Sequence, residues 1–516
     1  MKKIFTSMMV AVFLAVPQAM MADEYFFSPE GAGEMDGSSW ENAASGDLLG
    51  ATIKELGEGD AVYLMEGNYL PDVNFGYWQI PAGVTIKGGY PTTMTGTDTA
   101  ISYPTNGQSV WSADLDGDGE GDNGKQPFVV IGEETGNYEL FAKTVIAGIT
   151  IRDCVNSGGR DYGGAAMYLN DCTLEMDHCF FLNNKLTGKT DAGNPTRGGI
   201  IVARGCWIYF HDCVWRDNKS GCVGVAFQGR QSGGGTTENG GKGCYIIMDR
   251  CELSHNTVWD PITDKFTRYG GALAIADWGG TLVMVNSTVT DSHISWAGGM
   301  CRMGTGTTMY AVNNTWFNCT CNFGTRHSGD ILSMGTASTL YSMGNIAVTP
   351  TDDRVDMMST MFIQEGRCKW VSGGYNVWGS LFNASTDQPA PTDDIDKSHT
   401  QEYVFGDNEY TETDKLKFAI EPKEDFRGVP VADLQAFAEE IGLPEFIDVT
   451  VDMLGNKRPD TTVPGAYDNK GGTTGVQYVV DQPQPASQLV YDLQGRRLNA
   501  IPQHGLFIIN GKKVIK

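Results

Sequence analysis

The sequence predicts an all-β solenoid in which the short strands of successive coils stack on one another. A block with two cysteines seven residues apart recurs at 172–179, 206–213 and 244–251. Internal repeats with a period of a few tens of residues indicate stacked supersecondary units. We expect the same register to continue, without the cysteines, at Thr281–Thr288, Thr308–Thr315 and Thr339–Ile346.

Each block alternates apolar and polar residues with a period of two. Leu174 and Met176 are apolar, whereas Glu175 and Asp177 are polar. This alternation is typical of a half-buried strand whose apolar side chains face a core. Each block is therefore expected to form one strand of its coil.

Asparagine and double glycine mark the corners of each unit. A second short strand closes at Asn183, Asn218 and Asn256, and glycine and asparagine allow tight turns there. Each unit then holds three short strands and three turns. Because one unit cannot bury its own apolar face, neighbouring units must stack. The double glycines that open the next strand stand at 163–164, 198–199, 270–271 and 298–299.

The twelve cysteines are expected to be buried thiols rather than a disulfide framework. The chain is long enough to bury a large core without cross-links, and free cysteine is among the most buried residue types. The six-residue gap within each pair also differs from the short loops of zinc-binding cysteine motifs. The stack would place Cys172, Cys206 and Cys244 in one inward column and Cys179, Cys213 and Cys251 in another.

Residues 1–22 have the layout of a secretory signal peptide. Two lysines precede an apolar run from Met8 to Val16, and small residues follow as far as Ala22. The run is too short to span a bilayer, and we expect no transmembrane helix elsewhere. We therefore expect an exported protein.

The charge of the chain limits its partners. The formal net charge is -26. Phosphate binding needs clustered lysine and arginine, so nucleic acid and anionic lipid are disfavoured as partners. Divalent cations are compatible with this balance.

Several segments resemble exported bacterial proteins of known fold. The pairing of Phe-x-x-Asn with Gly-Gly-Ala is similar to the repeat of polymorphic outer-membrane proteins and related right-handed parallel β-helices. Gly37–Trp40 and Gly83–Tyr90 resemble their capping turn and first coils, and Asp452–Arg458 resembles their closing segment. The resemblance implies a right-handed parallel β-helix over residues 23–468, with three short strands per coil and an N-terminal cap. It implies no single activity, because this fold hosts lyases, hydrolases and adhesins alike.

A helix is expected near the end of the solenoid. Apolar residues recur at helical spacing from Val431 to Ile441, and Gly442 and Pro444 follow. We expect this helix to be a C-terminal lid over the open end, where an uncovered sheet edge would favour aggregation.

The composition changes after residue 468. Residues 469–489 are rich in glycine and proline and are expected to be a linker. Residues 490–516 contain Val490–Arg496 and Gly505–Lys513, which resemble the end of the C-terminal sorting domain of type IX secretion. The resemblance implies that export machinery reads this tail and that the protein is displayed on the outer surface of a Gram-negative bacterium. A small terminal hairpin without a sorting role is the alternative.

One acidic loop suggests a calcium site. Asp114, Asp116, Asp118 and Asp122 alternate with glycine, so several carboxylate oxygens can surround Ca²⁺. The twelfth position of an EF-hand-type loop is Lys125 rather than glutamate. A metal-free acidic loop is the alternative.

Two outward polar columns are expected just before the second cysteine of each block. Stacked acids beside histidine or arginine are the groups that polysaccharide-cleaving sites use, but any solvent-facing strand edge is also polar. The weak catalytic candidates are Asp177, His211, Asp212, Asp249 and Arg250. The full columns are expected to be Asp177, His211, Asp249, Asn286 and Asn313, and His178, Asp212, Arg250, Ser287 and Asn314.

Long insertions precede the double glycines at 185–197, 257–269 and 322–330. They are expected to leave the same corner of successive coils and to form one face, where function on solenoids usually lies. Aromatic side chains there suit contact with sugar or peptide, or they fold back over the coils. The residues concerned are Trp259, Tyr269, Trp296 and His327.

The function expected from these features is that of a secreted or cell-surface binding protein. It would be adhesin-like and would engage an extracellular glycan or a surface protein through the loop face. A polysaccharide lyase or glycoside hydrolase on the same fold is the alternative, and a structural surface component is another. Coplanar acids along one sheet would favour the enzyme, whereas a flat aromatic loop face would favour binding.

Overall fold

The structure is a computed structural model, and it forms two compact units, Met1–Gly472 and Thr473–Lys516, each described by itself. The signal-peptide segment lies outside the described residues, apart from Ala22. The described residues are 22–70, 78–105, 107–118, 121–122, 124, 127–132, 139, 142–158, 163–188, 198–220, 226–230, 243–258, 273–275, 279–294, 298–321, 329–335, 337–348, 359–363, 368–378, 381–383, 401–402, 428–468, 490–491, 497–498, 506–509 and 512–515.

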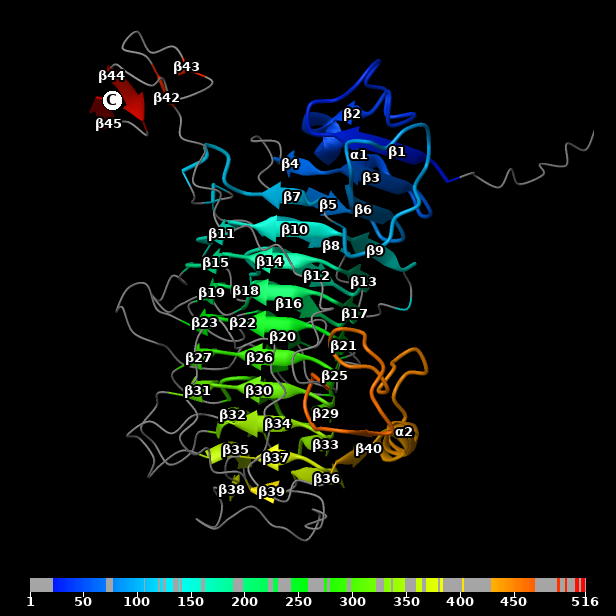
Figure 1. Ribbon diagram of the computed structural model, residues 1–516, viewed down its shortest axis with the longest axis vertical. Coiled ribbons are helices and arrows are strands. Elements are labelled where there is room, and N and C mark those ends of the chain that lie inside the picture. Colours follow the sequence, from blue (N-terminus) through cyan, green and yellow to red (C-terminus); the bar gives the residue numbers. More distant parts are fainter. Residues whose placement is uncertain are drawn as a thin grey trace, which may run out of the picture. The chain divides into compact units, whose positions relative to one another are not determined.

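The first unit is a parallel β-helix (Figure 1). Neighbouring strands of each sheet come from successive coils and pair in parallel, which is the signature of a solenoid. Sheet A has twelve strands: β2 (Ala44–Ser45), β1 (Glu24–Ser28), β3 (Ala61–Met65), β6 (Thr85–Tyr90), β9 (Thr144–Ala147), β13 (Thr173–Asp177), β17 (Trp207–His211), β21 (Tyr245–Asp249), β25 (Thr281–Val285), β29 (Thr308–Val312), β33 (Thr339–Met343) and β36 (Lys369–Gly374).

Sheet B continues each coil after a short turn. Its eleven strands are β4 (Gly67–Tyr69), β7 (Ser109–Ser112), β10 (Ile149–Arg152), β14 (Phe180–Leu182), β18 (Val214–Arg216), β22 (Glu252–Ser254), β26 (Thr288–Thr290), β30 (Thr315–Phe317), β34 (Ile346–Val348), β37 (Val377–Trp378) and β39 (Gln401–Glu402).

Sheets D and C complete the coil. The short sheet D follows sheet B and consists of β11 (Val155–Asn156), β15 (Lys185–Leu186), β19 (Lys219–Ser220), β23 (Thr257–Val258), β27 (His293–Ile294) and β31 (Thr320–Cys321). Sheet C consists of β5 (Trp78–Ile80), β8 (Val129–Ile131), β12 (Met167–Asn170), β16 (Ile201–Arg204), β20 (Phe227–Arg230), β24 (Leu273–Ile275), β28 (Cys301–Met303), β32 (Gly329–Met334), β35 (Ser359–Ile363) and β38 (Leu381–Asn383). The predicted all-β solenoid is thus confirmed, with a short fourth strand in several coils.

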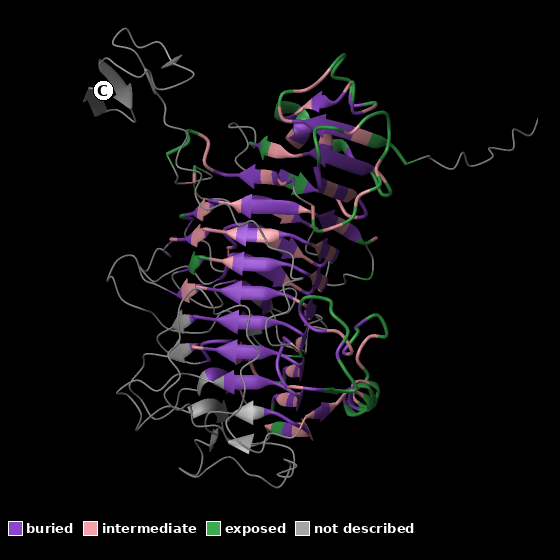
Figure 2. Cartoon of the chain, in the orientation of Figure 1, coloured by how far each residue is buried: buried purple, intermediate pink, exposed green. Residues whose placement is uncertain are grey.

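The core runs through the middle of the coils (Figure 2). Leu174 and Met176 of β13 are fully buried in it, as their alternation with Glu175 and Asp177 predicts. Aromatic rings add to the stack, and Phe181 lies 5.1 Å from Trp215 of the next coil in a parallel arrangement.

The cysteines form the two inward columns predicted for them. Nine of the ten cysteines whose burial the structure describes are buried. The Sγ atoms of Cys172 and Cys206 lie 3.6 Å apart, well beyond a disulfide bond length of about 2.05 Å. Burial raises the pKa of the Cys206 and Cys213 thiols well above its usual value. They therefore pack as small apolar groups.

Asparagine ladders satisfy the backbone at two inner corners. The Asn184 side-chain amide donates to Asn218 Oδ1 at 3.1 Å, and Asn218 donates to Asn256 Oδ1 at 2.9 Å. A second ladder joins Asn314 to Asn345 at 2.9 Å. These amides also bond backbone groups: Asn218 Oδ1 accepts from the Asn184 backbone N–H, and the Asn184 amide donates to the Ile151 carbonyl, so the ladder satisfies peptide groups in the buried turns.

Beyond Asp249 the register differs from the prediction by one residue. Thr281 pairs with Tyr245, not with Cys244, so the inward column after Cys251 continues at Ser287. Threonine begins each of these later strands at an outward position, and without cysteine no residue type fixes the register. A one-residue slip exchanges the two faces of a strand, so the predicted outward columns were wrong from this coil onward.

The N-terminal end contains a helix that the sequence analysis did not predict. The 3-10 helix η1 (Gly46–Leu48) leads into α1 (Leu49–Glu55), which contacts β5, the first strand of sheet C. Leu49 and Ile53 are fully buried in the core. The helix thus covers the interior at this end with its apolar side.

The expected C-terminal helix is α2 (Val431–Glu440), but it lies on the outer face of sheet A rather than over the end of the solenoid. Leu434 and Phe437 pack in one cluster with Val283 and Val285. These valines face outward, since Leu282 and Met284, which alternate with them along β25, enter the core. The apolar outer face therefore needs a cover, and this determines the position of the helix.

The segment after α2 continues along the same face, and we call residues 443–467 the C-terminal strap. Buried Arg458 holds it by donating to the carbonyls of Val451, Gly465 and Ala466 at 2.9 to 3.1 Å. The strand β40 (Val429–Pro430) pairs with β41 (Thr461–Thr462) and closes the segment into a loop. Among the described residues, neither helix is long and apolar enough to cross a membrane.

The second unit contains a small antiparallel sheet. Its strands are β42 (Val490–Tyr491), β43 (Arg497–Leu498), β44 (Leu506–Ile509) and β45 (Lys512–Ile515), in the order β43-β42-β44-β45. The predicted linker, 469–489, lies outside the described residues.

Candidate functional site

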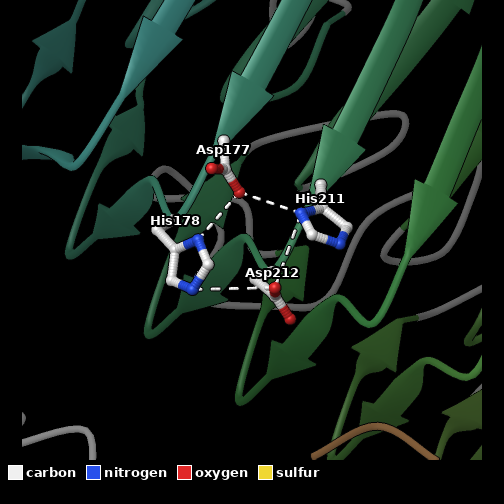
Figure 3. Close-up of side chains that lie close together, drawn as sticks. All are labelled: Asp177, His178, His211 and Asp212. Atoms are coloured by element: carbon white, nitrogen blue, oxygen red, sulfur yellow. Dashed lines mark hydrogen bonds and ion pairs between the residues drawn. The ribbon is translucent and has the colours of Figure 1, made fainter. Parts of the chain in front are cut away.

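Polar side chains gather at the turn that leads from sheet A to sheet B in three successive coils. Figure 3 shows the four that belong to the first two of these coils, Asp177, His178, His211 and Asp212. The turns follow β13, β17 and β21, which stack in parallel with Asp177 opposite His211 and His211 opposite Asp249. Each coil contributes the last residue of its strand and the residue after it. We call this group the polar turn cluster: Asp177, His178, His211, Asp212, Asp249 and Arg250.

The second residue of each turn has a left-handed backbone. The φ angles are 49° at His178, 50° at Asp212 and 52° at Arg250. This conformation suits glycine and asparagine, and other side chains adopt it at an energetic cost. Later coils have Asn286, Asn313 and Gly344 at the same position. Histidine and arginine are therefore not what the turn itself requires.

Asp177 joins the two imidazoles. Its Oδ1 lies 2.7 Å from His178 Nδ1 and 2.9 Å from His211 Nδ1. Burial alone would raise the pKa of Asp177, but the hydrogen bonds and positive charge of the histidines lower it well below its usual range. Asp177 is therefore a carboxylate near neutral pH.

Asp212 joins the histidines to Arg250. Its Oδ2 lies 3.6 Å from His178 Nε2 and 3.5 Å from His211 Nδ1. Arg250 donates to both carboxylate oxygens, with its Nε 2.9 Å from Oδ1 and its Nη2 2.5 Å from Oδ2. This two-point contact fixes the plane of the carboxylate and raises the pKa of Arg250.

His211 is the most constrained group of the cluster. Arg250 Nη2 lies 2.7 Å from its Nε2, which must accept, so the ring in this arrangement is neutral with its proton on Nδ1 toward Asp177. Burial lowers the pKa of His211, but the hydrogen bond to Asp177 and the charges of Asp212 and Asp249 outweigh it and raise the pKa. Protonation would place two donors against each other and displace Arg250.

Asp249 is buried with little compensation. It is 4% exposed, its Oδ2 lies 3.7 Å from His211 Nε2, and its Oδ1 makes no hydrogen bond. Burial raises the pKa of Asp249 to about 6, against the charges of His211 and Arg250, which lower it. A carboxyl group that titrates near neutral pH is a candidate for proton transfer.

The chain flanks the cluster on one side with Tyr103. Its ring stacks on His178 at 5.4 Å, and its hydroxyl donates to the Gly88 carbonyl at 2.8 Å. A Cβ at Gly148 would approach this ring to 2.4 Å, so glycine is required beneath it. Burial raises the pKa of Tyr103, which remains a neutral phenol.

The C-terminal strap flanks the other side. Phe446 lies 5.0 Å from the ring of Tyr209, and Tyr209 lies 5.7 Å from His211. Asn286, in the coil after Arg250, donates to the Asp448 carbonyl at 3.0 Å. The cluster thus lies where the cover of the strap ends.

Half-buried aromatic residues lie on the outer face of sheet A, along the strands that lead to the cluster, and Tyr209 adjoins His211. Trp207 and Tyr209 point outward from β17, and Trp207 pairs with Tyr245 of β21. Further along the face, Tyr310 and Tyr341 stack at 5.0 Å. The sequence analysis did not select these residues, although their alternation with Ile208 and Phe210 marks Trp207 and Tyr209 as outward.

The structure brings all the weak catalytic candidates together. Asp177, His211, Asp212, Asp249 and Arg250 are linked by the contacts above, although their spacing in the sequence shows only that they share a turn. His178 was assigned to a column but not selected, and it proves central. Asn286 and Asn313 belong beside Arg250, and Val285 and Val312 replace them beside Asp249.

The aromatic loop residues predicted to bind a ligand lie outside the described residues. These are Trp259, Tyr269, Trp296 and His327. The described strands do show where the insertions start: each leaves between a strand of sheet D and the next strand of sheet C. The polar turn cluster is at the junction of sheets A and B, so the two candidate regions occupy different corners of the coil.

Three of the four aspartates predicted to bind Ca²⁺ lie close together in the acidic loop. Ligand oxygens of Asp114, Asp116 and Asp122 lie within 4.8 Å of one another, in a group that does not include Asp118 among the described residues. Asp118 instead donates its backbone N–H to Asp114 Oδ1 at 3.1 Å. The Ca²⁺ site remains a prediction.

Comparisons with known proteins give similar folds only. No family model and no curated protein match the sequence. Similar solved structures include the pectate lyase Pel9A (11% identity, TM-score 0.35, 73% of this chain and 84% of that chain covered) and PfbA, a surface adhesin of Streptococcus pneumoniae (11%, 0.34, 66% and 75%). A third is the A-module of the Azotobacter vinelandii mannuronan C-5 epimerase AlgE6 (11%, 0.24, 68% and 93%). The fold assignment rests on the strand order itself.

Proposed function

We propose that this protein is an exported surface protein that binds an extracellular glycan along the outer face of sheet A, beside the polar turn cluster. The observation that carries the proposal is the group of half-buried aromatic side chains at Trp207, Tyr209 and Tyr245, on the two strands that lead to the polar turn cluster. Tyr209 adjoins His211, and Trp207 and Tyr245 pair at the start of these strands. Sites for small polar ligands combine an apolar surface with a few convergent polar groups.

The chemistry of this face favours a neutral glycan. Aromatic rings offer an apolar surface to the C–H side of a sugar ring, while carboxylates and imidazoles exchange hydrogen bonds with hydroxyl groups. The chain has a net charge of -26, so a polyanionic glycan is repelled unless cations intervene.

The test is retention of the protein on a panel of immobilised neutral and uronate-containing polysaccharides. We expect retention on a neutral glycan, and at least tenfold weaker binding for Trp207→Ala and Tyr245→Ala. Tyr168→Ala is the matched control, because Tyr168 is also half-buried but belongs to sheet C. Retention that is lost in Trp259→Ala but unchanged in Trp207→Ala would move the site to the loop corner and contradict the proposal.

A second candidate function is cleavage of a polysaccharide by a lyase or hydrolase. Asp249, whose pKa is raised to about 6, lies beside His211, and such a pair can donate and accept protons near neutral pH. New reducing or unsaturated ends from the same panel, absent with Asp249→Asn, would support cleavage. No product from any glycan that retains the protein would support binding alone.

The route of export is part of the proposal. The layout of residues 1–22 and the likeness of residues 490–516 to a sorting tail support secretion to the outer surface of a Gram-negative cell. Deleting residues 490–516 is expected to trap the protein inside the cell envelope, as measured by immunoblotting of cell and medium fractions. Unchanged amounts at the surface would show that the terminal sheet has no sorting role.

A further inference from the structure

The polar turn cluster has the donor set of a transition-metal site. Asp177 Oδ1, Asp212 Oδ2, His211 Nδ1 and a ring nitrogen of His178 all lie within 4.8 Å of one another. His211 Nδ1 lies 2.9 Å from the Asp177 oxygen and 3.5 Å from the Asp212 oxygen. His178 joins the set through one of its two ring nitrogens, either Nδ1 at 2.7 Å from Asp177 Oδ1 or Nε2 at 3.6 Å from Asp212 Oδ2. Ligands about 2.0 Å from a tetrahedral ion lie about 3.3 Å apart. The observed separations bracket that value, so small side-chain rotations would complete the coordination.

The charge of the cluster calls for a divalent cation. Asp177, Asp212 and Asp249 carry three negative charges when ionised, and Arg250 carries one positive charge. With neutral imidazoles the cluster therefore has two excess negative charges, on side chains that are mostly buried. One divalent ion would neutralise them, and unbalanced buried charge is otherwise costly.

The groups around the donors fit supporting roles. When a metal binds Nδ1 of a histidine, the Nε2 proton needs an acceptor, commonly a carboxylate. Metal binding at Nδ1 would leave the His211 proton on Nε2 and displace Arg250 Nη2, which lies 2.7 Å from that nitrogen. Asp249 is then the acceptor, since its Oδ2 is 3.7 Å from Nε2 and its Oδ1 is buried without a hydrogen bond. Arg250 holds the Asp212 carboxylate through its Nε at 2.9 Å.

The backbone supports a role beyond folding. His178, Asp212 and Arg250 occupy left-handed positions at which later coils have asparagine or glycine. Side chains that keep such a conformation often cluster at functional sites. The same turn forms without them, so their presence in three adjacent coils is explained by the group they build.

We propose that Asp177, His178, His211 and Asp212 bind one divalent transition-metal ion, with Zn²⁺ as the best match. Mixed imidazole and carboxylate donors suit Zn²⁺, whereas Ca²⁺ prefers oxygen donors alone. The site is distinct from the acidic loop at Asp114, which offers carboxylates only. The proposal is independent of glycan binding.

The test is titration of the metal-free full-length chain with Zn²⁺ by calorimetry, and with Co²⁺ by absorption spectroscopy. We expect one tight site per chain and visible Co²⁺ bands of tetrahedral intensity. His178→Asn and His211→Asn should each weaken binding at least tenfold. His178→Asn keeps the fold, because asparagine occupies this turn position in later coils, and circular dichroism checks this.

The matched control is His255→Asn. His255 also has a left-handed backbone, with φ of 54°, but it lies at the next turn of the coil and contacts Asp291 instead. Its variant should bind like the wild type, and Asp249→Asn should weaken binding about tenfold through His211. The proposal is overturned if neither metal binds, if both cluster variants bind like the wild type, or if Asp116→Asn alone abolishes binding.

Discussion

Along the outer face of sheet A, two groups of coils differ at the same position. Strands β13, β17 and β21 end in Asp177, His211 and Asp249, whereas the later strands β25 and β29 end in Val285 and Val312. α2 and the C-terminal strap cover the apolar ends, and the contact of Phe446 with Tyr209 marks where this cover meets the polar ones. The comparison teaches that α2 and the C-terminal strap cover the outer face of sheet A where its strands end in valine. The ionisable groups lie at the edge of this cover.

The same division holds for the residue after each strand. The early coils have His178, Asp212 and Arg250 in a left-handed conformation, and the later coils have Asn286 and Asn313 there. The later residues attach the strap: the side-chain amides of Asn286 and Asn313 donate to the carbonyls of Asp448 and Val449. The same left-handed turn therefore holds the strap by hydrogen bonds in the later coils and brings the polar side chains together in the earlier ones.

The largest effect on stability is expected from Val285→Asp, which gives the apolar region the residue that Asp249 supplies at the same position of the coil before. The side chain of Val285 is fully buried in the apolar cluster under the strap, so a carboxylate there would lose its hydration. We expect a loss of about 4 kcal/mol in the free energy of unfolding at pH 7. Urea denaturation measures this loss. A loss below about 1 kcal/mol in the free energy of unfolding would contradict this expectation and show that water reaches the side chain at position 285 beneath the strap.

Arg458→Ala should release the strap. The guanidinium of Arg458 is 3% exposed and donates to three strap carbonyls and to Asn286 Oδ1. Its removal leaves these acceptors unpaired, at a cost of about 3 kcal/mol. Hydrogen exchange should show faster exchange across residues 443–467. Exposed Lys457→Ala removes the same charge next to it and should change little.

Asp249→Asn should stabilise the protein at neutral pH. The pKa of Asp249 is raised to about 6, so its proton stabilises the folded state below pH 4, and this contribution is lost as the pH rises through 6. The wild type should therefore lose about 3 kcal/mol relative to the variant between pH 4 and 7. Thermal or urea unfolding across this range, with a chelator present, measures the difference. If the free energies of unfolding of the two proteins change in parallel with pH, the pKa of Asp249 is not raised in the folded state.

Phe446→Ala should have the smallest effect on stability. Phe446 is 53% exposed and touches Tyr209 at the border of the two regions. We expect a change below about 1 kcal/mol, because most of the ring already meets water. The variant should nevertheless alter glycan affinity, since it uncovers Tyr209. Identical affinity on the polysaccharide panel would place Tyr209 outside the binding face.

The fold could be predicted because strand alternation and corner residues recur in every coil. Leu174 and Met176 were assigned inward correctly, as was the cysteine column through Cys206. The predicted register is wrong by one residue from Thr281 onward, where the cysteines no longer recur, because threonine fits either face of a strand. A signal for the strap was present but unused: residues 282–285 are apolar without alternation, which indicates a strand buried on both faces.

The candidate site could be predicted only in part. The sequence places Asp177, His211 and Asp249 in one column, but it does not show that His178 points back to Asp177 or that Arg250 reaches the coil before it. Those contacts depend on the left-handed turn, which a sequence signals only when the residue is glycine or asparagine. With histidine at 178 and arginine at 250, the sequence gives no signal of the left-handed turn that brings these side chains together.

The strap has a consequence for the order in which the chain matures. The hydrogen bond between Arg458 and Asn286 joins residues 172 positions apart, so the coils from β25 onward are complete long before their outer cover is made. Until residues 429–467 have emerged, Val283, Val285 and Val312 face outward on a flat parallel sheet. Such a surface invites association with other unfinished chains. We therefore expect slower arrival of residues 429–467 to lower the fraction of chains that reach the native state.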